Sequence, residues 1–117
     1  MVTDALTLSH SIVSILEEKK GEDILLLDLV GVCSFTDYFV ICTGVSKRTL
    51  KALAEEVHLR TKNSQAIISR NVEGDASSGW VLIDYGDVIL HLFSPALRDY
   101  YRLEDLWREG KILLHIQ

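Results

Sequence analysis

Residues Gly79 to Phe93 read GWVLIDYGDVILHLF, and this stretch decides the fold that the sequence predicts. Two apolar runs, Trp80 to Ile83 and Val88 to Phe93, flank the tetrapeptide Asp84-Tyr85-Gly86-Asp87. Glycine at the third position of a four-residue turn tolerates a positive φ, and aspartate side chains can accept hydrogen bonds from nearby backbone N–H groups. The pattern therefore predicts a β-hairpin.

Neither arm of this hairpin alternates cleanly between apolar and polar residues. Val81 to Ile83 and Val88 to Leu90 are uninterrupted apolar runs. Such runs are typical of strands covered on both faces, so we expect the hairpin inside a sheet with helices packed on it. Asp84, Tyr85 and Asp87 then lie where the sheet meets solvent, and a tyrosine at the tip of a turn is expected to stay exposed.

Length and composition indicate a single globular domain. A chain of 117 residues with 48% hydrophobic residues can bury about two-thirds of its unfolded surface. Cys33 and Cys42 lie in or beside apolar runs, which favours free thiols in a reducing compartment over a single disulfide. We find no signal or transit segment and no apolar run near the roughly 18 residues of a membrane span, so we expect a cytoplasmic protein.

The charge balance restricts the class of partner. The formal net charge is −5, whereas a domain that binds a phosphate backbone normally carries a basic face. Direct, sequence-specific nucleic-acid binding is therefore disfavoured as the main activity. A basic protein surface fits better, because complementary charges speed the encounter of two proteins.

The rest of the chain predicts an α/β fold, with helices on both faces of a mixed sheet of about five strands. Apolar residues at spacings of three and four predict helices at 3–20, 46–62 and 95–101, followed by a helical turn at 103–107. Thr3 and Ser46 are the expected N-caps of the first two helices, and Ser94-Pro95 marks the start of the third. Further strands are predicted at 23–29, 37–43 and 66–69.

The connections between these elements suggest the topology. The short link between 23–29 and 37–43 favours antiparallel neighbours, and the segment 38–69 reads as a right-handed parallel strand–helix–strand crossover. Residues 71–78 read as a polar loop. We assign the domain to residues 1–107 and a C-terminal tail to 108–117. The tail's apolar segment could pack on the domain, pair with a sheet edge or be disordered, and the sequence does not decide between these.

The turn Gly44-Val45-Ser46-Lys47-Arg48 is the first candidate for chemistry, because a glycine turn that opens a helix exposes backbone N–H groups that attract anions. The turn lacks the G-x-x-x-x-G-K-[ST] spacing of a P-loop. Lys47 and Arg48 oppose the helix dipole by about 0.3–1 kcal/mol each. They are either solvated surface charges, or they face an acidic or polar partner, the protein's own carboxylates included.

Asp84 and Asp87 are the second candidate. Nucleotidyltransferases hold divalent metal ions with two strand carboxylates that follow a glycine-serine turn, and the order of residues here is superficially similar. Metal-supporting carboxylates on one strand need even spacing to share a face. Asp84 and Asp87 are three residues apart with a turn between them, so turn capping is the favoured role.

No motif supports a metal site, a cofactor or catalysis. The histidines and cysteines lack metal-ligand spacing, and Ser34 and Thr36 lack a nucleophile motif. His91, inside a predicted buried strand, is read as a satisfied core histidine. The amphipathic aromatic residues are the type that dominates binding hot spots: Tyr38, Trp80, Tyr85, Tyr100, Tyr101 and Trp107.

Several blocks of the chain, taken in order, resemble the ribosomal silencing factor (Iojap-like) family. The resemblance extends from the first predicted helix to Trp107, and its most specific blocks are TDYFVI (36–41) and WVLIDYGDVILH (80–91). The other matching residues are Cys42, Thr43, Gly44, Ser46, Arg48, Glu73, Gly74, Gly79, Phe93, Arg98, Asp99, Tyr100, Tyr101, Leu103, Glu104, Leu106 and Trp107.

This resemblance implies a nucleotidyltransferase-like α/β fold without transferase activity and without a cofactor. It implies binding to the large ribosomal subunit through the large-subunit protein numbered fourteen, at the face where the small subunit docks. Occupying that face blocks subunit joining and lowers translation when nutrients are scarce. Free members of the family commonly form homodimers. A degenerate nucleotidyltransferase-fold enzyme and a dimeric interaction module with a non-ribosomal partner are the alternatives.

We place the expected contacts with the ribosomal protein on the hairpin. The residues are Trp80, Asp84, Tyr85, Asp87, Val88 and His91. Further candidates for partner or dimer contacts are Asp37, Tyr38, Lys47, Arg48 and Arg98.

Overall fold

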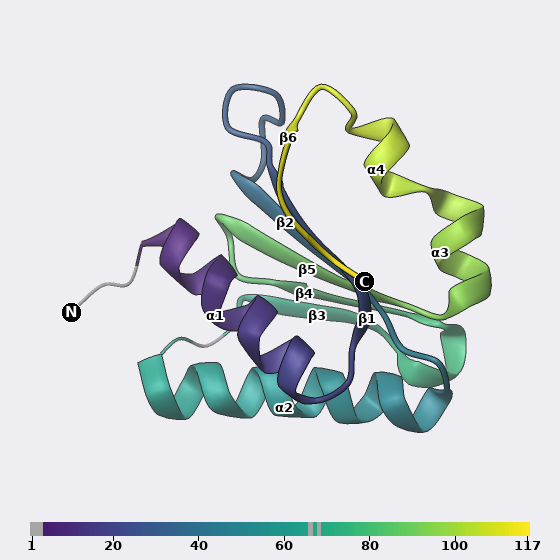
Figure 1. Ribbon diagram of the computed structural model, residues 1–117. Helices are drawn as coiled ribbons and strands as arrows, with labels where there is room; N and C mark the ends of the chain where they lie inside the picture. The colour runs from purple at the N-terminus through teal and green to yellow at the C-terminus, as the bar shows by residue number, and fades with distance from the viewer. Residues whose placement is uncertain (1–3, 66, 68) are drawn as a thin grey trace.

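The computed structural model describes residues 4–65, 67 and 69–117. It confirms the predicted α/β class, with helices on both faces of a mixed sheet that has one strand more than expected (Figure 1). The strands are β1 (Glu22–Asp28), β2 (Tyr38–Thr43), β3 (Asn71–Asp75), β4 (Trp80–Asp84), β5 (Val88–Phe93) and β6 (Lys111–Ile116). The helices are α1 (Ala5–Glu18), α2 (Lys47–Gln65), α3 (Pro95–Tyr101) and α4 (Leu103–Leu106).

The six strands follow the order β3-β4-β5-β2-β1-β6 across the sheet. The predicted hairpin is confirmed as the antiparallel pair β4–β5, and the predicted antiparallel pair of 23–29 with 37–43 is confirmed as β1–β2. Only β2 and β5 run parallel as neighbours within the described part of the sheet. Because β3 flanks β4 and β2 flanks β5, the hairpin lies inside the sheet rather than at its rim.

The segment after α2 differs from the prediction. Ala66 and Ile68 of the predicted strand 66–69 lie outside the described residues, and the strand of this region is β3, at positions predicted to be loop. A short 3₁₀ turn, η1 (Ala76–Ser78), follows it. The crossover from β2 through α2 therefore ends at the far sheet edge, with β5 and β4 between β2 and β3. All five β3 residues are exposed, so the strand lacks the apolar alternation that would have predicted it.

Helix starts follow the predicted capping chemistry, with one change. Ser46 Oγ accepts a hydrogen bond from the Thr49 backbone N–H at 3.1 Å, and Ser94 caps α3 ahead of Pro95. At α1 the cap is Asp4, whose carboxylate accepts from the Thr7 N–H at 2.8 Å, whereas the predicted cap, Thr3, lies outside the described residues. No helix in the described part of the chain is long and apolar enough to cross a membrane.

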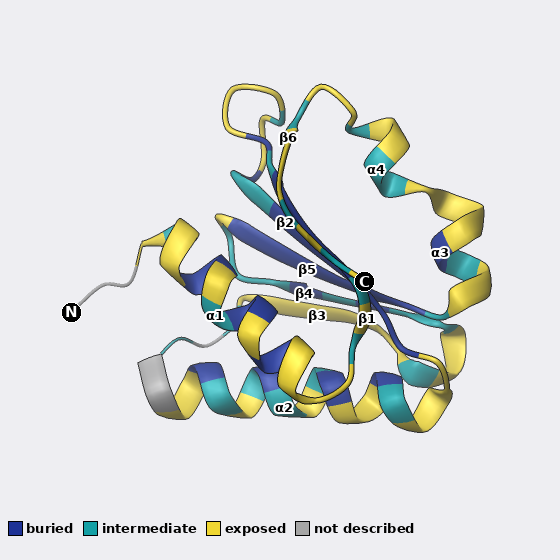
Figure 2. Ribbon diagram, viewed as in Figure 1, coloured by how far each residue is buried: buried dark blue, intermediate teal, exposed yellow. Residues whose placement is uncertain are grey.

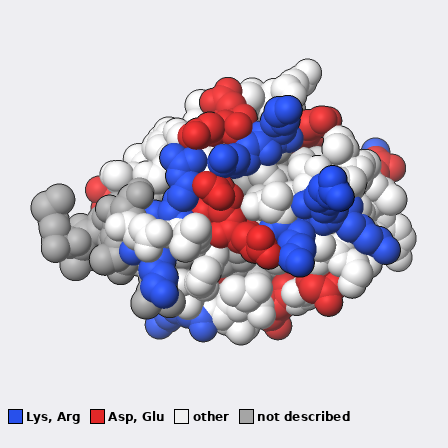
Figure 3. Space-filling model, turned by 90° about the horizontal axis from the view of Figure 1, so that it is seen from below, with Lys and Arg blue, Asp and Glu red and all other residues white. Residues whose placement is uncertain are grey.

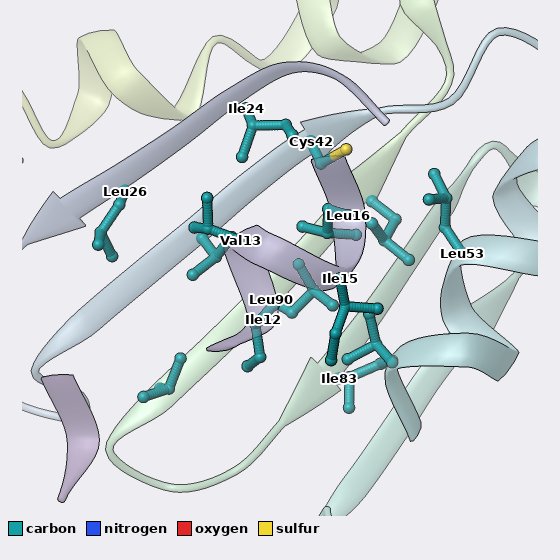
Figure 4. Packing of buried hydrophobic residues seen from close by; sticks show 14 of the residues in the cluster. Ile12, Val13, Ile15, Leu16, Ile24, Leu26, Cys42, Leu53, Ile83 and Leu90 are labelled. Atoms are coloured by element: carbon teal, nitrogen blue, oxygen red, sulfur yellow. The ribbon is translucent and has the colours of Figure 1, made fainter. Parts of the chain in front are cut away.

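The core lies in two layers, one on each face of the sheet. α1 and α2 cover one face (Figures 1 and 2), and Ile12 and Leu16 of α1 pack there with Leu53 of α2 and with Ile83 and Leu90 of the hairpin (Figure 4). α3 and α4 lie over the other face, on a smaller cluster. The members of the smaller cluster are Leu25, Leu27, Leu29, Phe39, Ile41, Ile89 and Phe93. This second layer leaves β4 only half-covered.

The chain's end takes one of the arrangements that the sequence left open, because β6 pairs antiparallel with β1 as an edge strand. Leu114 and Ile116 of β6 pack against the larger core cluster. The prediction of free thiols is confirmed for Cys33 and Cys42. Cys42 is fully buried, and burial raises the pKa of its thiol to about 12, so this thiol is unreactive at neutral pH.

Candidate partner-binding surface

The hairpin turn is built as its residues predict. The Asp84 carboxylate accepts a hydrogen bond from the Gly86 N–H at 2.7 Å, and the Tyr85 N–H donates to the Val88 carbonyl at 2.8 Å. Gly86 has a φ of 92°, which an L side chain rarely adopts. Asp84 therefore shapes the turn, as the three-residue spacing to Asp87 indicated.

Tyr85 does not project from the turn, and the expectation that it stays exposed is wrong. Its ring folds back onto the α1 and α2 face and packs against the larger core cluster. Its hydroxyl lies 3.0 Å from the Thr61 hydroxyl of α2, and burial raises the pKa of Tyr85. The tip of a turn can bury a large side chain when a long helix passes beneath it, and the sequence predicted this helix but not its position under the turn.

Carboxylates gather at this end of the sheet, beside the Arg70 side chain, which lies against Gly86 of the turn. The Asp87 carbonyl accepts hydrogen bonds from the N–H groups of Asp37 at 3.1 Å and Tyr38 at 3.0 Å, which ties the turn to the start of β2. Asp28 lies opposite Tyr38 across the β1–β2 ladder. Burial raises the pKa of Tyr38, and the carboxylates of Asp28 and Asp37 add to this shift. Asp37 and Tyr38, predicted as further partner or dimer contacts, thus lie beside Asp87, which was predicted as a contact with the ribosomal protein.

A half-covered stretch of sheet adjoins this acidic end. Trp80, Leu82 and Asp84 alternate along β4 with buried residues and are all partly exposed, because α3 covers this strand only in part. Glu73 of β3 lies opposite Leu82 in the ladder, so the two side chains share a face. Together with Tyr101 of α3 these residues form a surface that we call the open face: Glu73, Trp80, Leu82, Asp84 and Tyr101.

The open face is hollowed at its centre. A pocket of about 360 Å³ lies between β3, β4 and α3. Its lining residues are Glu73, Gly74, Ser78, Trp80, Leu82, Leu97 and Tyr101. Aromatic and aliphatic side chains make the floor, and Glu73 supplies a carboxylate, so the pocket suits a side chain that has an apolar stem and a positive end.

Aromatic rings fix the shape of this pocket. The Trp80 ring lies 4.8 Å from that of Tyr101 and 5.0 Å from that of Phe93, measured between centroids. Tyr100 stands at 89° to Tyr101, with centroids 5.0 Å apart. Tyr101 is 43% exposed and Tyr100 is 76% exposed, so the stack runs from the core to the surface. This is the arrangement of aromatic residues found at binding hot spots.

His91 positions the Trp80 ring through a hydrogen bond from the core side. The Trp80 indole N–H donates to His91 Nδ1 at 3.2 Å, so this nitrogen must be unprotonated. Burial lowers the pKa of His91 to about 3, and the imidazole is neutral at physiological pH. Nε2 has no hydrogen-bond partner among the described residues, but the Phe39 ring lies 4.6 Å away between centroids at 65°, a geometry that allows an N–H···π contact. His91 is therefore a core histidine that positions Trp80.

The remaining candidates lie apart from the open face. Val88 is fully buried, beneath α1 and α2. Arg98 is only 7% exposed; its guanidinium donates to Thr43 Oγ1 at 2.9 Å and pairs with Glu104 at 3.3 Å and with Asp23 at 3.5 Å. Arg98 thus joins α3, α4 and the central strands, which is a structural role.

Lys47 and Arg48 also lie away from the open face. They begin α2, at the opposite end of β2 from the acidic turn.

Sequence reasoning did not select Glu73, Leu82 or Tyr101 as candidate contacts. Glu73 was assigned to a loop, and only the β3–β4 register places it beside Leu82. Tyr101 was recognised only as one of several amphipathic aromatic residues. Within residues 4–65, 67 and 69–117, no three His, Cys, Asp or Glu side chains gather to hold a metal ion. The arrangement is suited to binding a protein surface.

Comparison with known proteins places the chain in a family. It matches the family described as "Ribosomal silencing factor during starvation" over residues 2–116. A ribosomal silencing factor of Bacillus subtilis is 38% identical over 96 residues, which cover 82% of this chain and 80% of the relative. A Mus musculus protein named "Mitochondrial assembly of ribosomal large subunit protein 1" is 32% identical over 101 residues, covering 82% of this chain and 43% of that protein.

A solved structure supports the same assignment. The crystal structure of a Chromobacterium violaceum protein, 38% identical in sequence, aligns with a TM-score of 0.85 and covers 91% of this chain and 88% of that chain. The matched family consists of regulatory factors rather than enzymes. By sequence and by fold, this chain belongs to the ribosomal silencing factor family.

Proposed function

We propose that this protein binds the large ribosomal subunit through the large-subunit protein numbered fourteen and sterically blocks docking of the small subunit. Translation would then be repressed in starvation or stationary phase, in the cytoplasm, without a cofactor. The family's description and the name of the mouse relative, which refers to the ribosomal large subunit, support the choice of partner.

The open face is the observation that carries this proposal. Its apolar centre, Trp80, Leu82 and Tyr101, is flanked by the carboxylates of Glu73 and Asp84. Ribosomal proteins are generally basic, and such a surface recognises a basic protein by apolar burial combined with charge pairing. Asp37 and Asp87 extend the acidic surface around the turn, and His91 positions Trp80 from within, whereas Val88 lies on the other face of the sheet.

Co-sedimentation of the full chain with isolated large subunits tests the proposal. We expect Tyr101→Ala and Glu73→Lys each to weaken binding by about tenfold or more, because each removes or reverses a central contact. Glu17→Lys is the matched control, since Glu17 is exposed on α1 on the other side of the sheet. Binding that is weakened equally by all three variants, or by none, would remove the open face from the account.

The two alternatives lead to different results. A degenerate nucleotidyltransferase would bind nucleoside triphosphate with Mg²⁺ in calorimetry, and we expect no heat of binding. A dimeric module with a non-ribosomal partner would not co-sediment with large subunits at any concentration. We also propose that the free protein is a homodimer, which analytical ultracentrifugation of the purified chain tests.

A further inference from the structure

A second hollow lies on the sheet face opposite to the open face, between β3 and the N-terminal half of α2. Its volume is about 550 Å³. We call it the α2–β3 groove, and its lining residues are Lys47, Arg48, Lys51, Ala54, Glu55, Val72, Gly74, Asp75, Ala76, Ser77 and Val81. Apart from Gly74, which lines both hollows, these residues lie outside the pocket of the open face, so the groove needs a separate explanation.

The floor of the groove is apolar and uncovered. Val72 pairs with Ile83 in the β3–β4 ladder, so its side chain shares the face that α1 and α2 bury elsewhere. Val72 is nevertheless 50% exposed, whereas Val81 and Ile83 beside it on β4 are 4% and 1% exposed. β3 is exposed along its length (Figure 2). The apolar layer of the fold is therefore incomplete at this edge.

The rim of the groove is basic. Lys47, Arg48 and Lys51 lie in the first turns of α2, where positive charge opposes the helix dipole. None of the three forms a salt bridge with a carboxylate among the residues that the structure describes. Figure 3 shows Lys and Arg side chains gathered toward the end of the molecule where α2 begins, at the right of that view. An anionic group of a partner beside this rim would be attracted by all three positive charges.

The border of the groove is a free strand edge. β3 is the terminal strand of the sheet and pairs only with β4 in the described part of the chain. An edge strand presents a row of backbone N–H and C=O groups on its outer side, and an extended peptide can pair with them as an additional strand. Every second side chain of such a peptide would then face the groove.

We propose that the α2–β3 groove binds an extended segment of a partner protein, added as a strand to β3, that presents apolar and acidic side chains to the groove. An apolar side chain would cover Val72, and acidic side chains would lie near Lys47 and Lys51. An RNA backbone fits less well, because the floor of the groove is apolar and a phosphate backbone has no apolar side chain to cover Val72. The surface is distinct from the open face, so the two can be occupied together.

A titration with a designed peptide tests this proposal. The probe is a peptide with blocked termini. Threonine occupies every odd position, and glutamate and valine alternate at the even positions. We expect saturable chemical-shift changes in the ¹⁵N-labelled full chain, centred on the amides of Val72, Lys51 and Ala54, with slower amide exchange along β3. A matched peptide with lysine in place of glutamate should bind about tenfold more weakly or worse.

Variants of the protein locate the contact. Lys47→Glu combined with Lys51→Glu should weaken binding of the glutamate peptide at least about tenfold, whereas Lys62→Glu, at the other end of the same helix, should leave it unchanged. Tyr101→Ala on the open face should also have no effect. These substitutions are at exposed positions, and the circular dichroism spectrum of each variant verifies its fold.

Several outcomes would overturn the proposal. Equal binding of the glutamate and lysine peptides, or shift changes centred away from β3, would show that the groove does not select an acidic strand. Binding of an oligouridylate but not of the peptide would assign the groove to a phosphate backbone. Protection of the β3 amides in a peptide-free dimer would show that a second copy of the chain fills the edge instead.

Discussion

The hydrogen bond between Trp80 and His91 ties the binding surface to the protonation state of a buried side chain. The indole N–H donates to Nδ1, so the pair requires a neutral imidazole. His91 is 4% exposed, and burial lowers its pKa from 6.5 to about 3. The folded state disfavours the charged form of His91. Its imidazole therefore takes up a proton when the protein unfolds, and not while the protein is native.

A pH dependence of stability follows from this pair. Between pH 6.5 and about 3 the unfolded chain binds a proton at His91 that the folded chain does not, so the free energy of unfolding falls as the pH is lowered through this window. The contribution amounts to about 2 kcal/mol between pH 7.5 and pH 5. Urea unfolding of wild type and of His91→Gln, which stays neutral, measures it. Identical pH dependence in the two proteins would contradict the assignment of His91 as the titrating group.

Tyr85 contributes to stability rather than to direct contact. Its ring packs against the core, and its hydroxyl lies 3.0 Å from that of Thr61. We expect Tyr85→Phe to lower the free energy of unfolding by about 1 kcal/mol and Tyr85→Ala by about 3 kcal/mol. Urea unfolding midpoints measure both changes. A Tyr85→Ala protein as stable as wild type would mean that the side chain is free at the turn, as the sequence had suggested.

At the scale of elements, β3 is held to β4 by a close backbone approach at Gly74. Its φ is 75°, and a Cβ there would collide with the Trp80 carbonyl oxygen. Gly31 has a φ of 79° but open space around it, which makes it a matched control. We expect Gly31→Ala to cost about 1 kcal/mol from backbone strain and Gly74→Ala about 2 kcal/mol or more. Thermal unfolding of the two variants tests this, and equal costs would show that the close approach is unimportant.

The C-terminal strand β6 completes the sheet on its other side. Removing residues 108–117 would uncover β1 and take away the packing of Leu114 and Ile116. We expect the shortened chain to lose at least about 2 kcal/mol of stability and to aggregate through its new edge. Light scattering and urea unfolding measure the two effects. Ile112→Lys is the control, because Ile112 is 62% exposed and its replacement leaves the strand in place.

The sequence predicted those elements whose local chemistry is sufficient to define them. The hairpin follows from its two apolar runs and the Asp84–Gly86 turn, and the helix starts follow from Ser46 and Ser94. β3 could not be predicted in this way, because an exposed edge strand has no apolar alternation, and its pairing partner defines it. The apolar tail that forms β6 could have packed on the domain, paired with a sheet edge or been disordered, and only its pairing with β1 decides between these.

The candidate surface was predictable in part, for a related reason. Trp80 and Asp84 have even spacing within one strand, so their common face can be deduced from the sequence. Glu73 and Tyr101 reach the same face through register and helix docking, which no local pattern records. Arg98 was misjudged as a possible contact, because its partners Asp23 and Thr43 are 75 and 55 residues away in the chain.

At the scale of the whole molecule, charges of both signs are interspersed, but carboxylates flank the open face and cations border the start of α2. The turn end and the open face carry carboxylates, among them Asp37, Asp84 and Asp87, whereas Lys47 and Arg48 stand at the start of α2. A net charge of −5 would repel ribosomal RNA, so the proposed approach to the large subunit depends on an acidic surface meeting a basic protein. This predicts that raising the salt concentration slows association more than it speeds dissociation.

We propose a steric mechanism, in which the protein prevents subunit joining by occupying the docking face. The most direct measurement is light scattering during reassociation of isolated small and large subunits, with and without saturating purified protein. The account predicts that the protein suppresses the scattering increase of joined ribosomes and that Glu73→Lys restores it, while Glu17→Lys still suppresses it. Reassociation to its normal extent in the presence of saturating wild-type protein would contradict the account.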